Sequence, residues 1–123
     1  MTYLAISVGA VLGANARYLV GGWVVDRLGA SFPYGTLLIN VTGSFLIGLI
    51  LTIVTERVLA PWWVRPTFAI GFLGSYTTFS TFSFETLGLV ATGSLAAAAA
   101  NVVASVGGAL IGVYLGTVVA RTI

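Results

Sequence analysis

Four long apolar stretches, separated by short polar segments, leave this chain few ways to fold. Only 7% of its 123 residues are charged, whereas a soluble domain carries roughly 25%. So few charges cannot cover a surface that faces water, and lipid must be the solvent for most of the chain. Each stretch is close to the ~20 residues that a helix needs to cross a bilayer. The stretches cover about residues 3–25, 35–54, 66–90 and 95–120.

Helices are the expected form of all four stretches, because backbone groups cannot stay unpaired in hydrocarbon. The stretches do not alternate between polar and apolar residues, as the strands of a membrane barrel do. The connections are short, so neighbouring helices should pack antiparallel. The sequence therefore predicts an all-α membrane protein with four transmembrane helices, in a single transmembrane domain over residues 1–123.

The residue types that are missing exclude several kinds of chemistry. The chain has no Cys and no His, which excludes disulfides, Cys or His metal sites and histidine acid–base catalysis. We therefore do not expect an enzyme. The net charge of +2 is too small and too dispersed to indicate nucleic-acid binding.

Glycines recur at the intervals that let membrane helices approach closely. Gly9 and Gly13 form one such pair, and Gly108, Gly112 and Gly116 form a row in the fourth stretch. We interpret the row as a contact face, whereas the pair is equally well explained by the abundance of glycine in membrane helices. The spacing does not say whether the contact lies within a subunit or between subunits.

The arginines are nearly balanced between the two sides of the membrane. Arg57, Arg65 and Arg121 fall on one side, and Arg27 falls on the other with Arg17 near that end of the first span. This is a feeble positive-inside bias. A chain with so little bias can insert in both orientations.

The third apolar stretch contains a polar run from Gly71 to Ser83, with six Ser or Thr among its residues. Glycines and hydroxyl side chains weaken a regular helix. Broken helices are tolerated at membrane depth where the freed backbone lines a cavity or binds an ion. We therefore expect an unwound turn around residues 74–78, with carbonyls suited to a hard cation. The alternative, hydroxyls that bond back to their own helix, is the weaker interpretation for so dense a cluster.

Phe79 and Phe82 are three residues apart and so share a helix face. Ordinary lipid-facing or core packing would also explain such a pair. Here hydroxyls lie beside the rings, and the edges of aromatic rings are electropositive. Together with the amide of Asn40, these groups could stabilise a partly dehydrated anion without a fixed charge. Conduction requires weak sites of this kind.

Two charged residues lie within the spans. We interpret Arg17 as a structural or vestibule residue that snorkels or caps a helix C-terminus, with a deep anion ligand as the alternative. Glu85 could pair with an arginine or bond to backbone. A proton relay is poorly equipped, because the chain has no histidine and one intramembrane acid.

The polar run, GFLGSYTTFSTFS, is followed by Glu85-Thr86 and resembles the signature of the Fluc (CrcB) fluoride channels. The segments PYGTLLIN at 33–40 and GANARY at 13–18 resemble the same family, and the resemblance covers the whole chain. It implies a fluoride-selective channel that exports fluoride passively and lowers its cytoplasmic concentration. The residues alone do not select fluoride over chloride, and that step rests on the family.

The resemblance also implies an assembly and residue roles. Two copies would form an antiparallel, dual-topology homodimer in the lipid bilayer, with two pores near the subunit boundary. Backbone carbonyls of Gly74 and Thr77 from both copies would hold a structural sodium ion that is not transported. The residues implied for the anion path are Asn40, Phe79, Ser80, Thr81, Phe82, Ser83, Asn101 and Ser105.

The main alternative function is a small four-helix exporter of cationic compounds. Such exporters need a carboxylate embedded in the first span, and the first span here has Arg17 and no acid. A non-transporting structural subunit is a third alternative, but it would not explain why the chain keeps a cluster of polar residues inside the membrane, where they are energetically unfavourable. The sequence is compatible with a multi-pass protein of a bacterial inner membrane.

Overall fold

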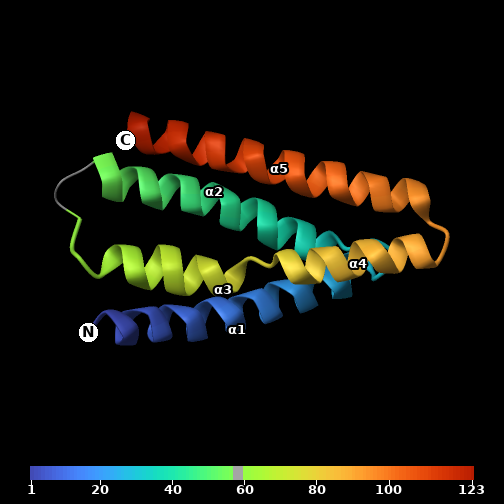
Figure 1. Ribbon diagram of the computed structural model, residues 1–123, viewed down its shortest axis with the longest axis horizontal. Coiled ribbons are helices and arrows are strands. Elements are labelled where there is room, and N and C mark those ends of the chain that lie inside the picture. Colours follow the sequence, from blue (N-terminus) through green and yellow to red (C-terminus); the bar gives the residue numbers. More distant parts are fainter. Residues whose placement is uncertain (57–59) are drawn as a thin grey trace.

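The protein is an all-helical assembly of membrane-length elements. The computed structural model describes residues 1–56 and 60–123, and no strand occurs in that part of the chain. Figure 1 shows the helices lying along one long axis, with both termini at the same end. The prediction of an all-α fold is confirmed. Arg57, which the sequence analysis counted in the charge balance, lies outside the described residues. The elements are α1 (Thr2–Leu28), α2 (Tyr34–Glu56), η1 (Arg65–Leu73), α3 (Gly74–Tyr76), α4 (Phe79–Ala91) and α5 (Leu95–Thr122).

Three helices, α1, α2 and α5, are long and apolar enough to cross a membrane by length and composition. The remaining expected span, about residues 66–90, is divided. Its first part is η1, a π-helix with wider turns, which continues into α3. Its second part is α4, and the thin segment between the two parts is visible near the middle of Figure 1.

The helix is interrupted near the predicted place, but over fewer residues than 74–78. Thr77 has ψ 157°, and Thr78 has φ −152° and ψ 117°, so both are extended. The Thr77 N–H still donates to the Leu73 carbonyl at 3.0 Å, which keeps Gly74 in the helix. The break therefore uses two β-branched residues that favour extended backbone, and not the flexibility of Gly74.

Glycines bring four of these elements into two close pairs. α2 packs along α5, and α1 packs along η1. A side chain added at most of the packed glycines would meet backbone atoms of the facing helix, and one added at Gly108 would meet the side chain of Val41. The contacts are made within one subunit, which answers the question that the spacing left open. They place Gly112 and Gly116 against Val41 and Phe45, and Gly9 and Gly13 against Thr67 and Phe72.

A small buried cluster lies next to the break. Ile39 of α2 packs there with Leu73 and Tyr76. The Tyr76 hydroxyl is 3.1 Å from the hydroxyl of Thr42, which in turn donates to its own helix. The cluster fixes the last turn before the break against α2.

α4 is packed differently from the other long helices. Among its residues only Phe82 is buried. It packs against α5 and α2. The residue before its first turn is Thr78, whose Oγ1 accepts a hydrogen bond from the Thr81 N–H at 3.2 Å. This is a helix N-cap. At the other end, Gly93 has φ 79° and turns the chain into α5.

We predict that Gly116→Ala will destabilise the protein by about 2 kcal/mol, because the new methyl group overpacks the α2–α5 contact. The methyl group would collide with the carbonyl oxygen of Phe45. Gly107→Ala is the matched control, since its methyl group would have no neighbour within 4 Å. The free energy of unfolding in mixed micelles, titrated with a denaturing detergent, measures both. Equal stability of the two variants would contradict the prediction.

Candidate functional site

The side-chain amide of Asn40, on α2, holds the break in place. Its Oδ1 accepts a hydrogen bond from the Thr78 N–H at 2.8 Å, and its Nδ2 donates to the Thr78 carbonyl at 2.9 Å. These two bonds replace the helical bonds that the extended residue has lost, as the membrane interior requires. An amide nitrogen carries two hydrogens, so one remains for other partners. Asn40 is therefore first a clamp on the backbone.

The break also changes the partners of two carbonyls. In a continuous helix the Thr78 N–H would donate to the carbonyl of Gly74, but here it donates to Asn40. Gly74 is exposed at the surface of the subunit. The Thr77 carbonyl accepts a long hydrogen bond, 3.4 Å, from Nη1 of Arg17. The guanidinium therefore lies at the C-terminal end of the η1–α3 helix, where positive charge is favourable.

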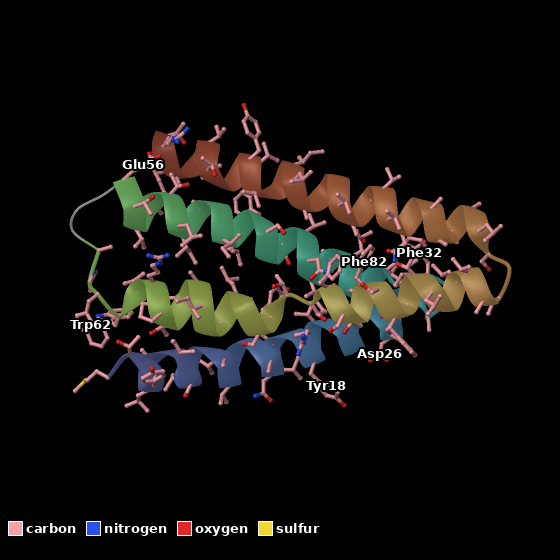
Figure 2. All side chains as sticks on the ribbon, in the orientation of Figure 1. Tyr18, Asp26, Phe32, Glu56, Trp62 and Phe82 are labelled. Carbon is pink, nitrogen blue, oxygen red and sulfur yellow. The ribbon has the colours of Figure 1, made fainter. Side chains whose placement is uncertain are left out.

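A groove of about 310 Å³ follows the break on one side of the subunit, between α2, α4 and α5. The rings of Phe79 and Phe82 lie along it, with centroids 5.5 Å apart and planes tilted by 46°. Phe82 is 8% exposed, whereas Phe79 is 77% exposed. Figure 2 shows Phe82 near the start of α4. Polar groups on the same groove come from Asn40, Ser44, Thr77, Thr78 and Ser105.

A larger cavity of about 950 Å³ opens between α1, α2 and α4, and we call it the vestibule. Arg17 and Thr81 are among its lining residues, together with Thr36 and Glu85. The Thr36 hydroxyl donates to Oε1 of Glu85 at 2.9 Å, and within residues 1–56 and 60–123 Glu85 pairs with neither an arginine nor backbone. Thr78 lines both the vestibule and the groove. The break therefore contributes a wall to both hollows.

The hydroxyls of the polar run divide into two groups. One group donates to carbonyls of its own helix, as the weaker interpretation of the sequence had it, and contains Ser75, Thr77 and Ser83. The Ser75 hydroxyl also lies 2.9 Å from the Ala10 carbonyl of α1, a second acceptor for it. The other group gathers around Thr78, whose Oγ1 donates to Thr81 at 3.0 Å and lies 3.3 Å from the hydroxyl of Ser80. Ser80 and Thr81 are both exposed. A hydroxyl has one hydrogen. The hydroxyl hydrogen of Ser83 is thus donated to the Phe79 carbonyl. The Thr81 hydroxyl accepts a hydrogen bond from Thr78, so its own hydrogen remains available for another partner.

The polar residues of α5 form a chain of hydrogen bonds to α4. Asn101 is 1% exposed, and its Nδ2 donates to Oγ1 of Thr86 at 2.9 Å. Ser105 donates to Oδ1 of Asn101 at 3.2 Å. Thr86 donates to the carbonyl of Phe82 at 2.7 Å. Ser105 lines the groove, whereas the amide of Asn101 is directed at α4.

Three residues that make hydrogen bonds within the candidate site were not given a role by the sequence analysis. Thr78 had a usable signal, because a threonine placed just before a helix is a common N-cap. Thr36 and Thr86 lie in segments that carry the family resemblance, but their hydrogen-bond partners could not be predicted, since Glu85 and Asn101 lie 49 and 15 residues away along the chain. Only the fold brings these pairs together.

Comparison with known proteins gives matches over the whole chain. Residues 4–117 match the family described as "CrcB-like protein, Camphor Resistance (CrcB)". A protein of Roseiflexus sp. (strain RS-1) named "Fluoride-specific ion channel FluC" is 49% identical over 123 residues, 100% of this chain and 99% of that protein. Proteins of the same name from Acidobacterium capsulatum and Geobacter metallireducens are 48% and 49% identical, covering 100% and 98% of this chain and 98% of each relative.

We predict that Asn40→Ala will destabilise the protein by about 2 kcal/mol, because the backbone N–H and carbonyl of Thr78 then lose their partners inside the membrane. Asn15→Ala is the matched control, since the Asn15 amide is exposed and donates to a carbonyl of its own helix. Unfolding free energies compare the two variants, and hydrogen exchange at the Thr78 amide should accelerate only in Asn40→Ala. Slow exchange there in both variants would show that another group holds the break.

Proposed function

The chain belongs to the CrcB-like family, and on that premise we propose that it is a fluoride-specific ion channel. It is a multi-pass protein of a bacterial plasma membrane and a channel, not an enzyme. Passive export of fluoride through it would lower the cytoplasmic concentration of the ion. The observation that carries the proposal is the groove beside Phe79 and Phe82, which offers aromatic rings, hydroxyls and an amide but no fixed charge.

The groove suits a small, partly dehydrated anion. The edges of the rings of Phe79 and Phe82 carry partial positive charge. Asn40 has one amide hydrogen beyond the one that it gives to the break. Ser105 adds a hydroxyl from α5. Each of these contacts is weak, which allows an ion to leave as readily as it enters. Ser80, Thr81 and Ser83 on α4, together with Asn101, complete the set of residues that we assign to the path or its border.

Arg17 supports the proposal from the vestibule. It lines that cavity and reaches the break through the Thr77 carbonyl. A positive charge at the mouth of a narrow polar path raises the local concentration of anions. The same arrangement disfavours an exporter of cationic compounds, because the carboxylate of α1, Asp26, is exposed near the C-terminal end of that helix (Figure 2) and does not lie at its middle.

We further propose that the channel is an antiparallel homodimer. A single subunit leaves the groove open on one side and Phe79 77% exposed. A second copy seated on this face would close the groove and cover the ring. The near balance of arginines between the two ends of the helices suits insertion in both orientations, which an antiparallel pair requires.

A sodium ion at the centre of this dimer is part of the proposal. The Gly74 carbonyl has lost its helical donor and Gly74 is exposed, so this oxygen can face a partner. Carbonyl oxygens are ligands that hard cations accept. The Thr77 carbonyl is the second proposed ligand, and it has two lone pairs, of which Arg17 uses one. Two-fold symmetry would supply the same pair of oxygens from the other copy.

The function is tested by ion efflux from liposomes that contain the purified protein. We expect fast release of fluoride and release of chloride that is lower by several orders of magnitude, because chloride is too large for a path built around a dehydrated small ion. A fluoride-selective electrode and a chloride electrode measure the two fluxes under the same gradient. Equal efflux of both ions, or none, would refute the proposal.

The same assay tests the phenylalanines. Phe79→Ile and Phe82→Ile keep apolar volume but remove the ring edge, so each should cut fluoride efflux by at least about tenfold. Phe84→Ile is the matched control, because Phe84 is 79% exposed on the same helix and is not among the residues that line the groove. Light scattering checks that all three variants keep the oligomeric state of the parent. Normal efflux in both pore variants would remove these rings from the path.

The proposed cation site predicts dependence on sodium. Purification with caesium in place of sodium should weaken the dimer or its fluoride efflux, because the larger ion does not fit carbonyls spaced for a smaller one. Size-exclusion chromatography with light scattering gives the dimer fraction, and return of sodium should restore it. A dimer that is indifferent to the exchange, with unchanged efflux, argues against a site at Gly74 and Thr77.

A further inference from the structure

α4 carries both phenylalanines of the groove, yet apolar packing within its own subunit does little to hold it. Among its residues from Phe79 to Ala91 only Phe82 is buried. Three polar contacts fix it from outside: Asn40 binds Thr78 before its first turn, Thr36 binds Glu85, and Asn101 binds Thr86. A helix held mainly by hydrogen bonds depends on each of them for its exact position, because no tightly packed face compensates for a lost one.

We propose that Asn101 is a positioning residue that sets the place of Phe82 by way of Thr86, without touching the ion. This inference rests on the proposed function. Asn101 is 1% exposed and lies in α5 on the side that meets α4. The Thr86 hydroxyl accepts a hydrogen bond from Asn101 at 2.9 Å and donates one to the Phe82 carbonyl at 2.7 Å. The relay thus ends on the backbone of the residue whose ring borders the groove.

The orientation of the Asn101 amide is fixed by a further contact. Ser105 donates to its Oδ1 at 3.2 Å, so the amide nitrogen is the end that points to Thr86. Ser105 also lines the groove. Asn101 therefore joins two walls of the groove, Ser105 on α5 and Phe82 on α4, and holds them at a set separation.

The experiment compares Asn101→Leu and Thr86→Val, alone and together, in the fluoride efflux assay over a series of fluoride concentrations. Leu and Val keep the number and branching of the side-chain heavy atoms and remove the hydrogen bond. A small displacement of a site residue can cost a large factor in rate, and we expect each single variant to lose about tenfold in efflux at saturating fluoride. The double variant should lose no more than either single one, since both remove the same contact.

Two further variants separate positioning from general stability. Thr86→Ser keeps the hydroxyl and should restore efflux to near the parent value. Thr55→Val removes an exposed hydroxyl that, in the described part of the chain, bonds only to its own helix, and it should change neither efflux nor the melting temperature. The melting temperature and the dimer fraction of each variant are measured in parallel.

Each other outcome overturns the inference in a recognisable way. Loss of efflux in Asn101→Leu with parent-like efflux in Thr86→Val would mean that Asn101 meets the ion directly. Additive losses in the double variant would mean that the two residues act independently. Efflux lost only in proportion to a lower melting temperature, without rescue by Thr86→Ser, would make the contact a structural tie alone. A parent protein without fluoride efflux would refute the proposed function itself, whichever way the variants behave.

Discussion

The pair of hydrogen bonds between the Asn40 amide and the Thr78 backbone is the contact on which the rest of the site depends. Inside a membrane, an extended residue in the middle of a helix must find partners for its N–H and carbonyl or the helix closes again. Asn40 supplies both from α2. Because the Thr78 N–H is taken, the Gly74 carbonyl is released, and because Thr78 is extended, its hydroxyl is free to cap α4. The Asn40 side chain thus holds the point where the Gly74 carbonyl loses its helical partner and where α4, which carries the aromatic rings, begins.

The subunit combines two kinds of helix packing with different consequences. The α2–α5 and α1–η1 pairs are joined through glycines such as Gly116 and Gly9, with backbone against backbone and little room to adjust. α4 is held by hydrogen bonds such as that of Thr36 with Glu85, over a surface that remains largely exposed. Rigid pairs provide a fixed frame, and the element that carries Phe79 and Phe82 is attached to it at a few defined points.

The sequence predicts the frame better than the site because the two depend on different information. Hydropathy and length find the spans, and the composition of Gly71 to Ser83 locates the interruption. The exact break could not be read, because Gly74 is the obvious weak point of the helix while Thr77 and Thr78 are the residues that open. What decides between them is Asn40, which lies 38 residues away along the chain. The roles that we propose for Thr86 and Asn101 could not be predicted for the same reason. The sequence does not show whether a polar residue within a span binds an ion or another helix.

The placement of charges explains how a path for anions can be strong enough to attract and weak enough to conduct. A full charge about 4 Å from an ion is worth several kcal/mol in a medium of intermediate polarity, which is deep enough to trap it. In this subunit Arg17 lines the vestibule and donates a hydrogen bond to the Thr77 carbonyl. Glu85 lines the same cavity and accepts a hydrogen bond from Thr36. The groove is lined by uncharged polar groups, by the rings of Phe79 and Phe82 and by small or aliphatic residues, with no charged side chain among them. An ion drawn in by the arginine would therefore move from a charged mouth into a neutral passage, where each contact is small and none can hold it for long.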